Sequence, residues 1–247
     1  MTAPGPDDSL ALLAVVAHPD DAELTCGGTL IKAAKAGHRT GILDLSAGEM
    51  GSKGSAELRA AEAARANAIL GVATRETLGL PDAGIVNSPE NRLRLAGALR
   101  RLRPAIVIAP APPPFGRHPD HRAAAELIRD AVFVAGLRKL GDELPPFRPR
   151  KVVHCITYRE DYQKPTFVVD ISDEFEEKLA AIRCYASQFD GAVQAGEVYP
   201  NGEPLYDIVR HQAAHYGSLI RTRYGEPFHT TETMRVDDIT QLQVPTF

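Results

Sequence analysis

The feature that most constrains the fold is an unbroken apolar run at residues 10–17, followed by an abrupt change to polar residues. The length of this run suits a strand, and continuous rather than alternating hydrophobicity is typical of a strand covered on both faces. Such a strand belongs at the centre of a parallel sheet. Because parallel neighbours need crossover connections, helices are expected between successive strands.

The rest of the chain follows this alternation. Up to residue 109 the pattern predicts helices at 24–36, 55–71 and 91–103, and strands at 39–45, 74–78 and 105–109. Beyond it we expect strands at 151–158 and 166–171, and helices at about 122–140, 172–188 and 205–222. This order is typical of an α/β, three-layer Rossmann-like fold with a mostly parallel twisted sheet, whose ligands bind at the carboxyl ends of the strands.

Length and charge narrow the class of protein. The 247 residues suit a single domain, 1–247, with looser tails at 1–8 and about 236–247. The 28 basic and 32 acidic side chains give a net charge of −4 without blocks of like charge, which argues against a nucleic-acid partner. The start lacks a basic segment, and the run at 10–17 is too short to span a bilayer. We therefore expect a cytoplasmic protein without a membrane partner.

The cysteines indicate a reducing compartment. Cys26, Cys155 and Cys184 are odd in number, widely separated and form no Cys-x-x-Cys pair. Neither a disulfide framework nor a thiolate zinc site is expected from this pattern. Cys26 and Cys184 fall in predicted helices, where we expect them to be small buried residues.

Two similar polar motifs follow two of the predicted strands. The first strand runs into His18-Pro19-Asp20-Asp21, and the strand at 105–109 leads to His118-Pro119-Asp120-His121. The carboxyl ends of parallel strands share one edge of the sheet, so the motifs should converge. His18, Asp21 and His121 would then supply two imidazoles and one carboxylate to a metal, leaving positions for water as catalytic zinc requires.

The remaining polar residues of these motifs suit acid–base chemistry. Asp20 lies beside a ligand but should point elsewhere, where it could take a proton from water and pass it to a leaving amine. His118 and Asp120 could pair, the carboxylate favouring an imidazolium that faces a developing oxyanion. Each residue also has an ordinary structural role, such as a helix cap, but those roles do not explain why both clusters end strands at one edge.

These residues resemble a known family. The two His-Pro-Asp motifs, together with Gly27-Gly28-Thr29, resemble the PIG-L/LmbE-like family of zinc-dependent N-deacetylases that act on N-acetylglucosaminyl conjugates. Within it, the chain is most similar to the deacetylases of bacillithiol biosynthesis. That likeness rests on the stretches at 45–52, 80–82, 167–171 and 187–189, and on Arg59.

The resemblance implies roles at matching positions. His18, Asp21 and His121 would bind zinc, with Fe²⁺ as an alternative metal, while Asp20 acts as general base and His118, supported by Asp120, as oxyanion stabiliser. Arg59 would contact substrate, and Tyr206, or else Tyr199, would cover the site. The expected reaction is deacetylation of a small-molecule conjugate, N-acetylglucosaminyl malate, by a homo-oligomer.

Other functions stay open at this point. The conjugate could instead carry inositol or be a chitooligosaccharide, because one arginine does not choose among these groups. Two histidines and a carboxylate also bind iron in non-haem oxygenases, although those usually have all-β folds. A non-catalytic module that binds a sugar conjugate or a nucleotide is a further alternative, but Gly-x-Gly-x-x-Gly is missing after the first strand.

Overall fold

A computed structural model describes residues 9–51, 53–112, 118–140, 144–156, 164–189, 205–241 and 243–244. Its core is a seven-stranded sheet in the order β3-β2-β1-β4-β5-β7-β6. The strands are β1 Leu12–Val16, β2 Thr40–Asp44, β3 Thr74–Thr77, β4 Ile106–Pro110, β5 Lys151–Cys155, β6 Phe167–Asp170 and β7 Gly225–His229. The first five strands are parallel, and β7 pairs antiparallel with both β5 and β6.

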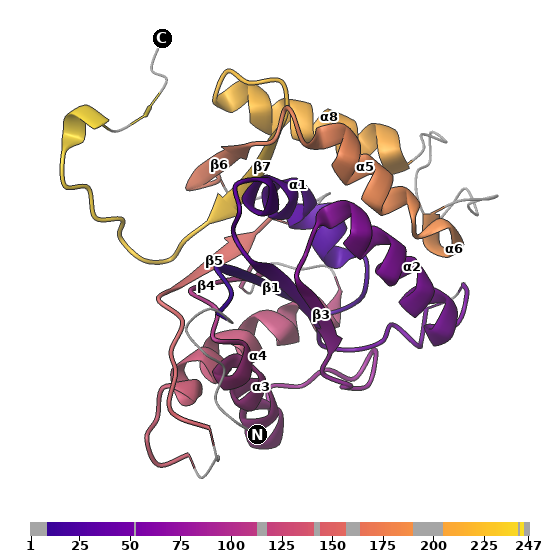
Figure 1. Ribbon diagram of the computed structural model, residues 1–247, viewed down its shortest axis with the longest axis vertical. Helices are drawn as coiled ribbons and strands as arrows, with labels where there is room; N and C mark the ends of the chain where they lie inside the picture. The colour runs from indigo at the N-terminus through magenta and orange to yellow at the C-terminus, as the bar shows by residue number, and fades with distance from the viewer. Residues whose placement is uncertain are drawn as a thin grey trace.

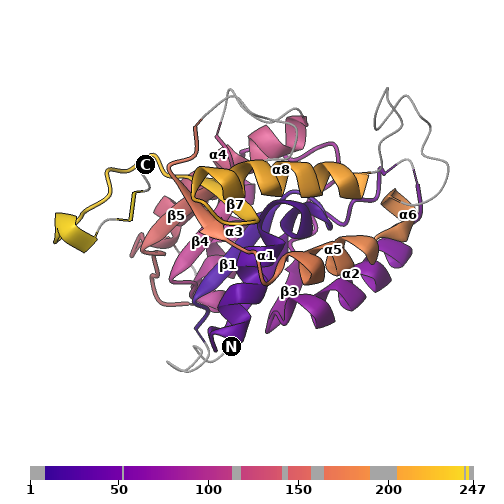
Figure 2. The ribbon, with the colours of Figure 1, turned by 90° about the horizontal axis from the view of Figure 1, so that it is seen from above.

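Helices cover both faces of the sheet and make three layers (Figures 1 and 2). They are α1 Asp21–Lys35, α2 Ala56–Leu70, α3 Pro89–Leu102, α4 Pro119–Ala135, α5 Phe175–Arg183, α6 Ala186–Phe189 and α8 Leu205–Leu219, with a 3₁₀ turn, η2, at Ile239–Gln241. One core cluster packs α3 and α4 against the sheet, and a second packs α1 and α2 against its other face. The expected α/β fold is confirmed. Within the described residues, no helix is long and apolar enough to cross a membrane.

The first strand has the predicted central position. β1 lies between β2 and β4, and residues Leu13–Val16 are almost fully buried. The helix expected from residue 24 begins earlier, at Asp21, and the backbone of Cys26 interrupts it with a φ of −141°. Cys26 and Cys155 are buried, Cys184 is only partly buried, and all three are free thiols.

Glu226 of β7 secures the interrupted helix. Its carboxylate accepts hydrogen bonds from the backbone N–H groups of Gly28 and Thr29, at 2.8 and 2.7 Å, just after the break in α1. The ammonium group of Lys178 on α5 lies 2.6 Å from the same carboxylate. A Cβ on Gly28 would lie 2.9 Å from the side chain of Ile171, so only glycine lets α1 approach this closely.

Three sequence expectations need correction in the second half. The helix expected at 172–188 is two helices, α5 and α6, although its predicted inner face is right because Phe175, Leu179, Ile182 and Tyr185 are all fully buried. The helix expected from 122 begins at Pro119 and ends at Ala135. β7 was not predicted, because Gly-Glu-Pro-Phe-His shows neither an apolar run nor clean alternation.

Candidate metal centre and active site

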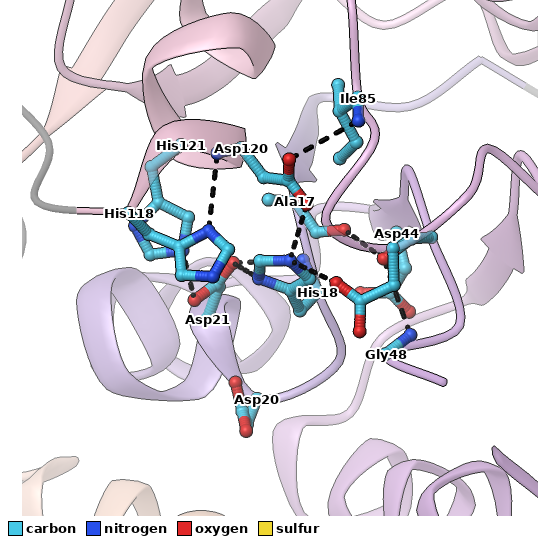
Figure 3. A network of polar contacts seen from close by, with 12 residues as sticks. Ala17, His18, Asp20, Asp21, Asp44, Gly48, Ile85, His118, Asp120 and His121 are labelled. Carbon is cyan, nitrogen blue, oxygen red and sulfur yellow. Dashed lines mark hydrogen bonds and ion pairs between the residues drawn. The ribbon is translucent and has the colours of Figure 1, made fainter. Parts of the chain in front are cut away.

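The two His-Pro-Asp motifs meet at the carboxyl ends of adjacent strands. His18 follows β1 directly and Asp21 begins α1, while His118 and His121 lie at the start of α4. β1 and β4 pair in parallel, so the two motifs emerge on the same side (Figure 3). The rings of His18, His118 and His121 lie with centroids 4.9 to 5.4 Å apart. The predicted convergence is therefore present.

The carboxylate of Asp21 lies between two of these histidines. Its Oδ1 is 3.1 Å from Nε2 of His121, and its Oδ2 is 3.5 Å from Nδ1 of His18. The backbone N–H of His18 also donates to Oδ2, at 2.9 Å. Ligands bound at zinc's usual distances in a tetrahedron lie about 3.3 Å apart. The carboxylate-to-histidine separations thus suit a metal ion at this point, with nitrogen and oxygen donors that zinc accepts.

Two partly overlapping groups of potential ligands surround His18. Donor atoms of His18, His118 and His121 lie within 4.8 Å of one another, and so do those of His18, Asp82 and Asp120. The second group shares only His18 with the expected ligands. Its two carboxylates face Nε2 of His18, at 3.0 and 3.2 Å, whereas Asp21 faces Nδ1. His18 can therefore offer Nδ1 to a metal while its Nε2–H donates to carboxylates, an arrangement that fixes the ring.

This geometry corrects the expected pairing of Asp120 with His118. The Asp120 carboxylate faces His18 instead, and the backbone N–H groups of Ala83 and Ile85 donate to it at 2.7 and 3.3 Å. Only the backbone N–H of Asp120 reaches His118, donating to Nδ1 at 3.2 Å. The side chain of Asp120 thus contacts a ligand candidate rather than the His118 ring, although its charge still raises the pKa of His118.

His118 is consequently better suited to act as a neutral donor. It caps α4, and because Nδ1 accepts a backbone hydrogen bond, the proton of the neutral ring resides on Nε2. Burial lowers the pKa of His118, and so do the nearby charges of His18 and His121. A neutral imidazole with its proton on Nε2 can donate a hydrogen bond to a developing oxyanion.

Neighbouring carboxylates raise the pKa values of His18 and His121, the other two histidines of this cluster. Burial lowers the pKa of His18, but hydrogen bonding and the charges of Asp21 and Asp82 outweigh it and raise the value to about 9. The pKa of His121 is also raised against its burial, by Asp21. A metal ion that binds these rings must therefore displace protons.

Asp20 occupies a constrained position beside the cluster. Its φ of 104° is left-handed, which is rare outside glycine and turns its carboxylate away from that of Asp21. Arg59 on α2 donates to it through Nη2 at 2.7 Å, and both side chains are buried. Burial raises the pKa of Asp20 to about 7 even though Arg59 lowers it. A carboxylate with that pKa is well placed to exchange protons at neutral pH.

Arg59 is held by a glycine-rich loop as well as by Asp20. Its Nη1 donates to the carbonyl oxygen of Gly48 at 3.0 Å. Gly48 has a φ of +69°, and a Cβ there would lie 2.0 Å from Nη1 of Arg59. Glycine is therefore favoured both by the left-handed backbone and by the close approach of Arg59. The buried Nε of Arg59 has no hydrogen-bond partner among the described residues. The expected contact of Arg59 with substrate stays a prediction.

Asp82 is a site residue to which sequence reasoning assigned no role. Besides facing His18, its Oδ2 accepts the backbone N–H of Met50 at 2.8 Å, and its own N–H donates to Glu49. Asp82 therefore connects two loops of the site. One is the loop at 48–50, which binds Arg59, and the other is the loop at 82–85, which binds Asp120. The sequence signal that could have identified Asp82 as a site residue is its position in Leu-Pro-Asp, just beyond the third strand.

The tyrosine expected over the site lies on the first turn of α8. The guanidinium carbon of Arg183 on α5 is 5.2 Å from the ring centroid of Tyr206, and Tyr206 packs beside the cluster that joins α5 to α8. The alternative, Tyr199, lies outside the described residues. A role for Tyr206 at the substrate thus stays a prediction.

The chain is similar to known deacetylases. The family model for GlcNAc-PI de-N-acetylase, PIG-L, matches residues 13–132, which include both His-Pro-Asp motifs. A diacetylchitobiose deacetylase of Thermococcus kodakarensis is 33% identical, over 89% of this chain and 82% of that protein. A Bacillus anthracis protein named "Probable N-acetyl-alpha-D-glucosaminyl L-malate deacetylase 2" is 24% identical, over 72% of this chain and 81% of that protein.

Solved structures give the same result. A conserved protein of Thermus thermophilus superposes with a TM-score of 0.82 and 43% identity, covering 92% of this chain and 98% of that one. The N,N'-diacetylchitobiose deacetylase of Pyrococcus horikoshii superposes with a TM-score of 0.77 and 30% identity, covering 90% and 84%. The chain therefore belongs to the PIG-L family of metal-dependent N-deacetylases.

Proposed function

We propose that this chain is a zinc-dependent hydrolase that removes the acetyl group from an N-acetylglucosaminyl conjugate. The observation that carries the proposal is the juxtaposition of three metal-ligand candidates, His18, Asp21 and His121, with a buried carboxylate at Asp20 whose pKa is near 7. A purely binding protein would have no evident use for that carboxylate beside a metal. The free thiols fit work in a reducing cytoplasm.

Each residue of the site has a separate role in the proposed reaction. Bound at His18, Asp21 and His121, zinc would supply Lewis-acid activation of water and of the amide carbonyl. Asp20 takes a proton from the attacking water as the new C–O bond forms, and it returns the proton to nitrogen as the C–N bond breaks. The Nε2–H of His118 donates to the amide oxygen as negative charge develops there. The products are acetate and a free amine.

The contacts of the proposed positioning residues fit the same reaction. Asp82 and Asp120 fix the ring of His18 through its Nε2–H. Arg59 fixes the carboxylate of Asp20 and opposes the rise in its pKa. Fe²⁺ is the alternative metal for the same ligands, so activity should be compared after loading with each ion.

The sugar conjugate that we favour for the first test is N,N'-diacetylchitobiose. Deacetylases of that substrate are 33% identical in sequence and 30% identical in structure-based comparison, against 24% for the malate-conjugate relative. The malate expectation also relied on Arg59, whose charge is already paired with Asp20. Inositol conjugates are the second candidate class by the same comparison, because deacetylases of an inositol conjugate are 28% identical to this chain.

A deacetylation panel tests the proposal. Zinc-loaded protein would be incubated with diacetylchitobiose, N-acetylglucosaminyl malate, an inositol conjugate and free N-acetylglucosamine, and amine release would be followed. We expect turnover of at least one conjugate, with diacetylchitobiose highest in kcat/KM. The absence of amine release from every conjugate with metal bound would favour the binding module, and a malate preference would restore the original expectation for the substrate.

A further inference from the structure

Two histidines on α8 lie outside the metal centre and have no part in the proposed reaction. They are His211 and His215, which stand four residues apart in the stretch His-Gln-Ala-Ala-His. Both lie within the helix that runs from Leu205 to Leu219. Figure 1 shows α8 at the edge of the molecule, on the side of the sheet away from α3 and α4. The pair is therefore separate in the fold from the two His-Pro-Asp motifs.

The packing of α8 turns both histidines outward. The inner face of the helix packs against α5 through buried side chains at 205, 209 and 213. Positions 211 and 215 follow the same spacing of four on the opposite side of the helix. Both histidines are exposed, and so is Asp207 one turn before them. We call Asp207, His211 and His215 the outer stripe of α8.

The spacing of the two histidines suits one shared ligand. Residues four apart on a helix have Cβ atoms about 5–6 Å from one another, so two imidazole rings can reach one ion. The same spacing brings two histidines to zinc in helical His-Glu-x-x-His motifs. The ring of His215 lies beside the buried ring of Tyr216, with centroids 5.1 Å apart. Within the part of the chain that the structure describes, neither histidine ring makes a hydrogen bond or an ion pair. Both rings can therefore bind a metal without losing such a contact.

The charges around the pair favour a cation. Asp207 lies four residues before His211, so its negative charge belongs to the same stripe. Arg210 is the neighbour of His211 in the sequence, but its guanidinium is directed to α5, where it pairs with Glu176 at 2.9 Å. Imidazole nitrogens suit zinc, copper and nickel, whereas Mg²⁺ and Ca²⁺ prefer oxygen ligands. The expected ligand is thus a divalent transition-metal ion.

We propose that His211 and His215 form a second metal site, which binds Zn²⁺ or a similar transition-metal ion on the surface of α8. Water completes the coordination, since two protein ligands leave positions open. An ion that joins two successive turns also stabilises α8, because only the helical conformation presents both rings to it. The inference rests on α8 alone and does not depend on the proposed deacetylation.

Three variants test this site. His215→Gln removes one ligand. The double variant His215→Gln with Gln212→His keeps the number of histidines but places them on adjacent residues, about 100° apart around the helix. His38→Ala removes an exposed histidine that has no other histidine three or four residues away, and it serves as control. Equilibrium dialysis against Zn²⁺, followed by metal analysis, would give the number of ions bound per chain, and circular dichroism would verify folding.

The wild-type chain and His38→Ala should bind one more zinc ion per chain than the two α8 variants, whatever the metal centre binds. Loss of His215 should weaken binding of this ion by at least about tenfold, because disturbing even the surroundings of a ligand commonly costs about 10- to 100-fold in affinity. Excess Mg²⁺ should not displace the ion. Equal zinc binding by all four proteins would overturn the proposal, and so would full binding by the double variant or displacement of the ion by Mg²⁺.

Discussion

Replacing Arg59 with methionine separates two roles for this arginine. In the structure it lies against Asp20 with a separation of 2.7 Å between Nη2 and Oδ2, and both side chains are buried. The charge of Arg59 lowers the pKa of Asp20, which burial otherwise raises, and the balance lies at about 7. Methionine keeps much of the packing volume but removes the charge. The pKa of the proposed base should therefore rise.

The size of the effect follows from that shift. Loss of a close opposite charge typically moves a carboxyl pKa by about 1–3 units, which would place Asp20 at roughly 8–10. The basic fraction of Asp20 would then fall about 5-fold to 500-fold at pH 7, but only by about 11-fold or less at pH 9. The rate lost at neutral pH should return as the pH rises.

The assay is the pH dependence of kcat and kcat/KM for a neutral conjugate, measured on zinc-loaded protein. Arg65→Met serves as the control, because Arg65 is an exposed arginine on the same helix. The control should keep the wild-type profile. A uniform fall in rate across the pH range, or a higher KM with an unchanged profile, would refute control of the base by Arg59 and favour direct contact with substrate.

Three further predictions concern the base, the ligands and the fold. Asp20→Asn should keep zinc and KM but lower kcat by about 10² to 10⁴, measured by turnover beside metal analysis, and near-normal turnover would move the base elsewhere. Zinc affinity measured by calorimetry should rise about tenfold per pH unit for each proton displaced, up to the His18 pKa of about 9, and a flat affinity would contradict the ligand set. Glu226→Ala leaves Lys178 buried without its carboxylate partner, and urea unfolding should show a loss of about 3–5 kcal/mol. A loss below about 1 kcal/mol would mean that this pair does not secure α1.

The sequence predicted what depends on periodicity and on the topology of parallel sheets. The apolar run at 10–17 predicts the central strand, and the rule that strand carboxyl ends share one edge predicts that His18 and His121 lie close together, as they do. β7 was missed because Gly225 and Pro227 interrupt its pattern, and its place between β5 and β6 depends on pairing that no local signal encodes.

The finer contacts of the site depend on how loops meet. Asp120 belongs to the same motif as His118, which follows β4. Its carboxylate nevertheless contacts His18, which follows the neighbouring strand β1. Spacing along the chain could not distinguish those partners, since both are within a side chain's reach. The same limit applies to Arg59, whose pairing with Asp20 requires the left-handed turn at Asp20 and the close approach at Gly48.

The most direct test of the account is a zinc titration of metal-free protein, with amine release from N,N'-diacetylchitobiose as the readout. We predict that activity rises in proportion to added zinc and levels off at an equimolar amount, and that a folded His121→Ala protein binds zinc weakly and gains no activity. Full turnover by the metal-free protein, or an unchanged titration after loss of His121, would contradict a catalytic metal held by His18, Asp21 and His121.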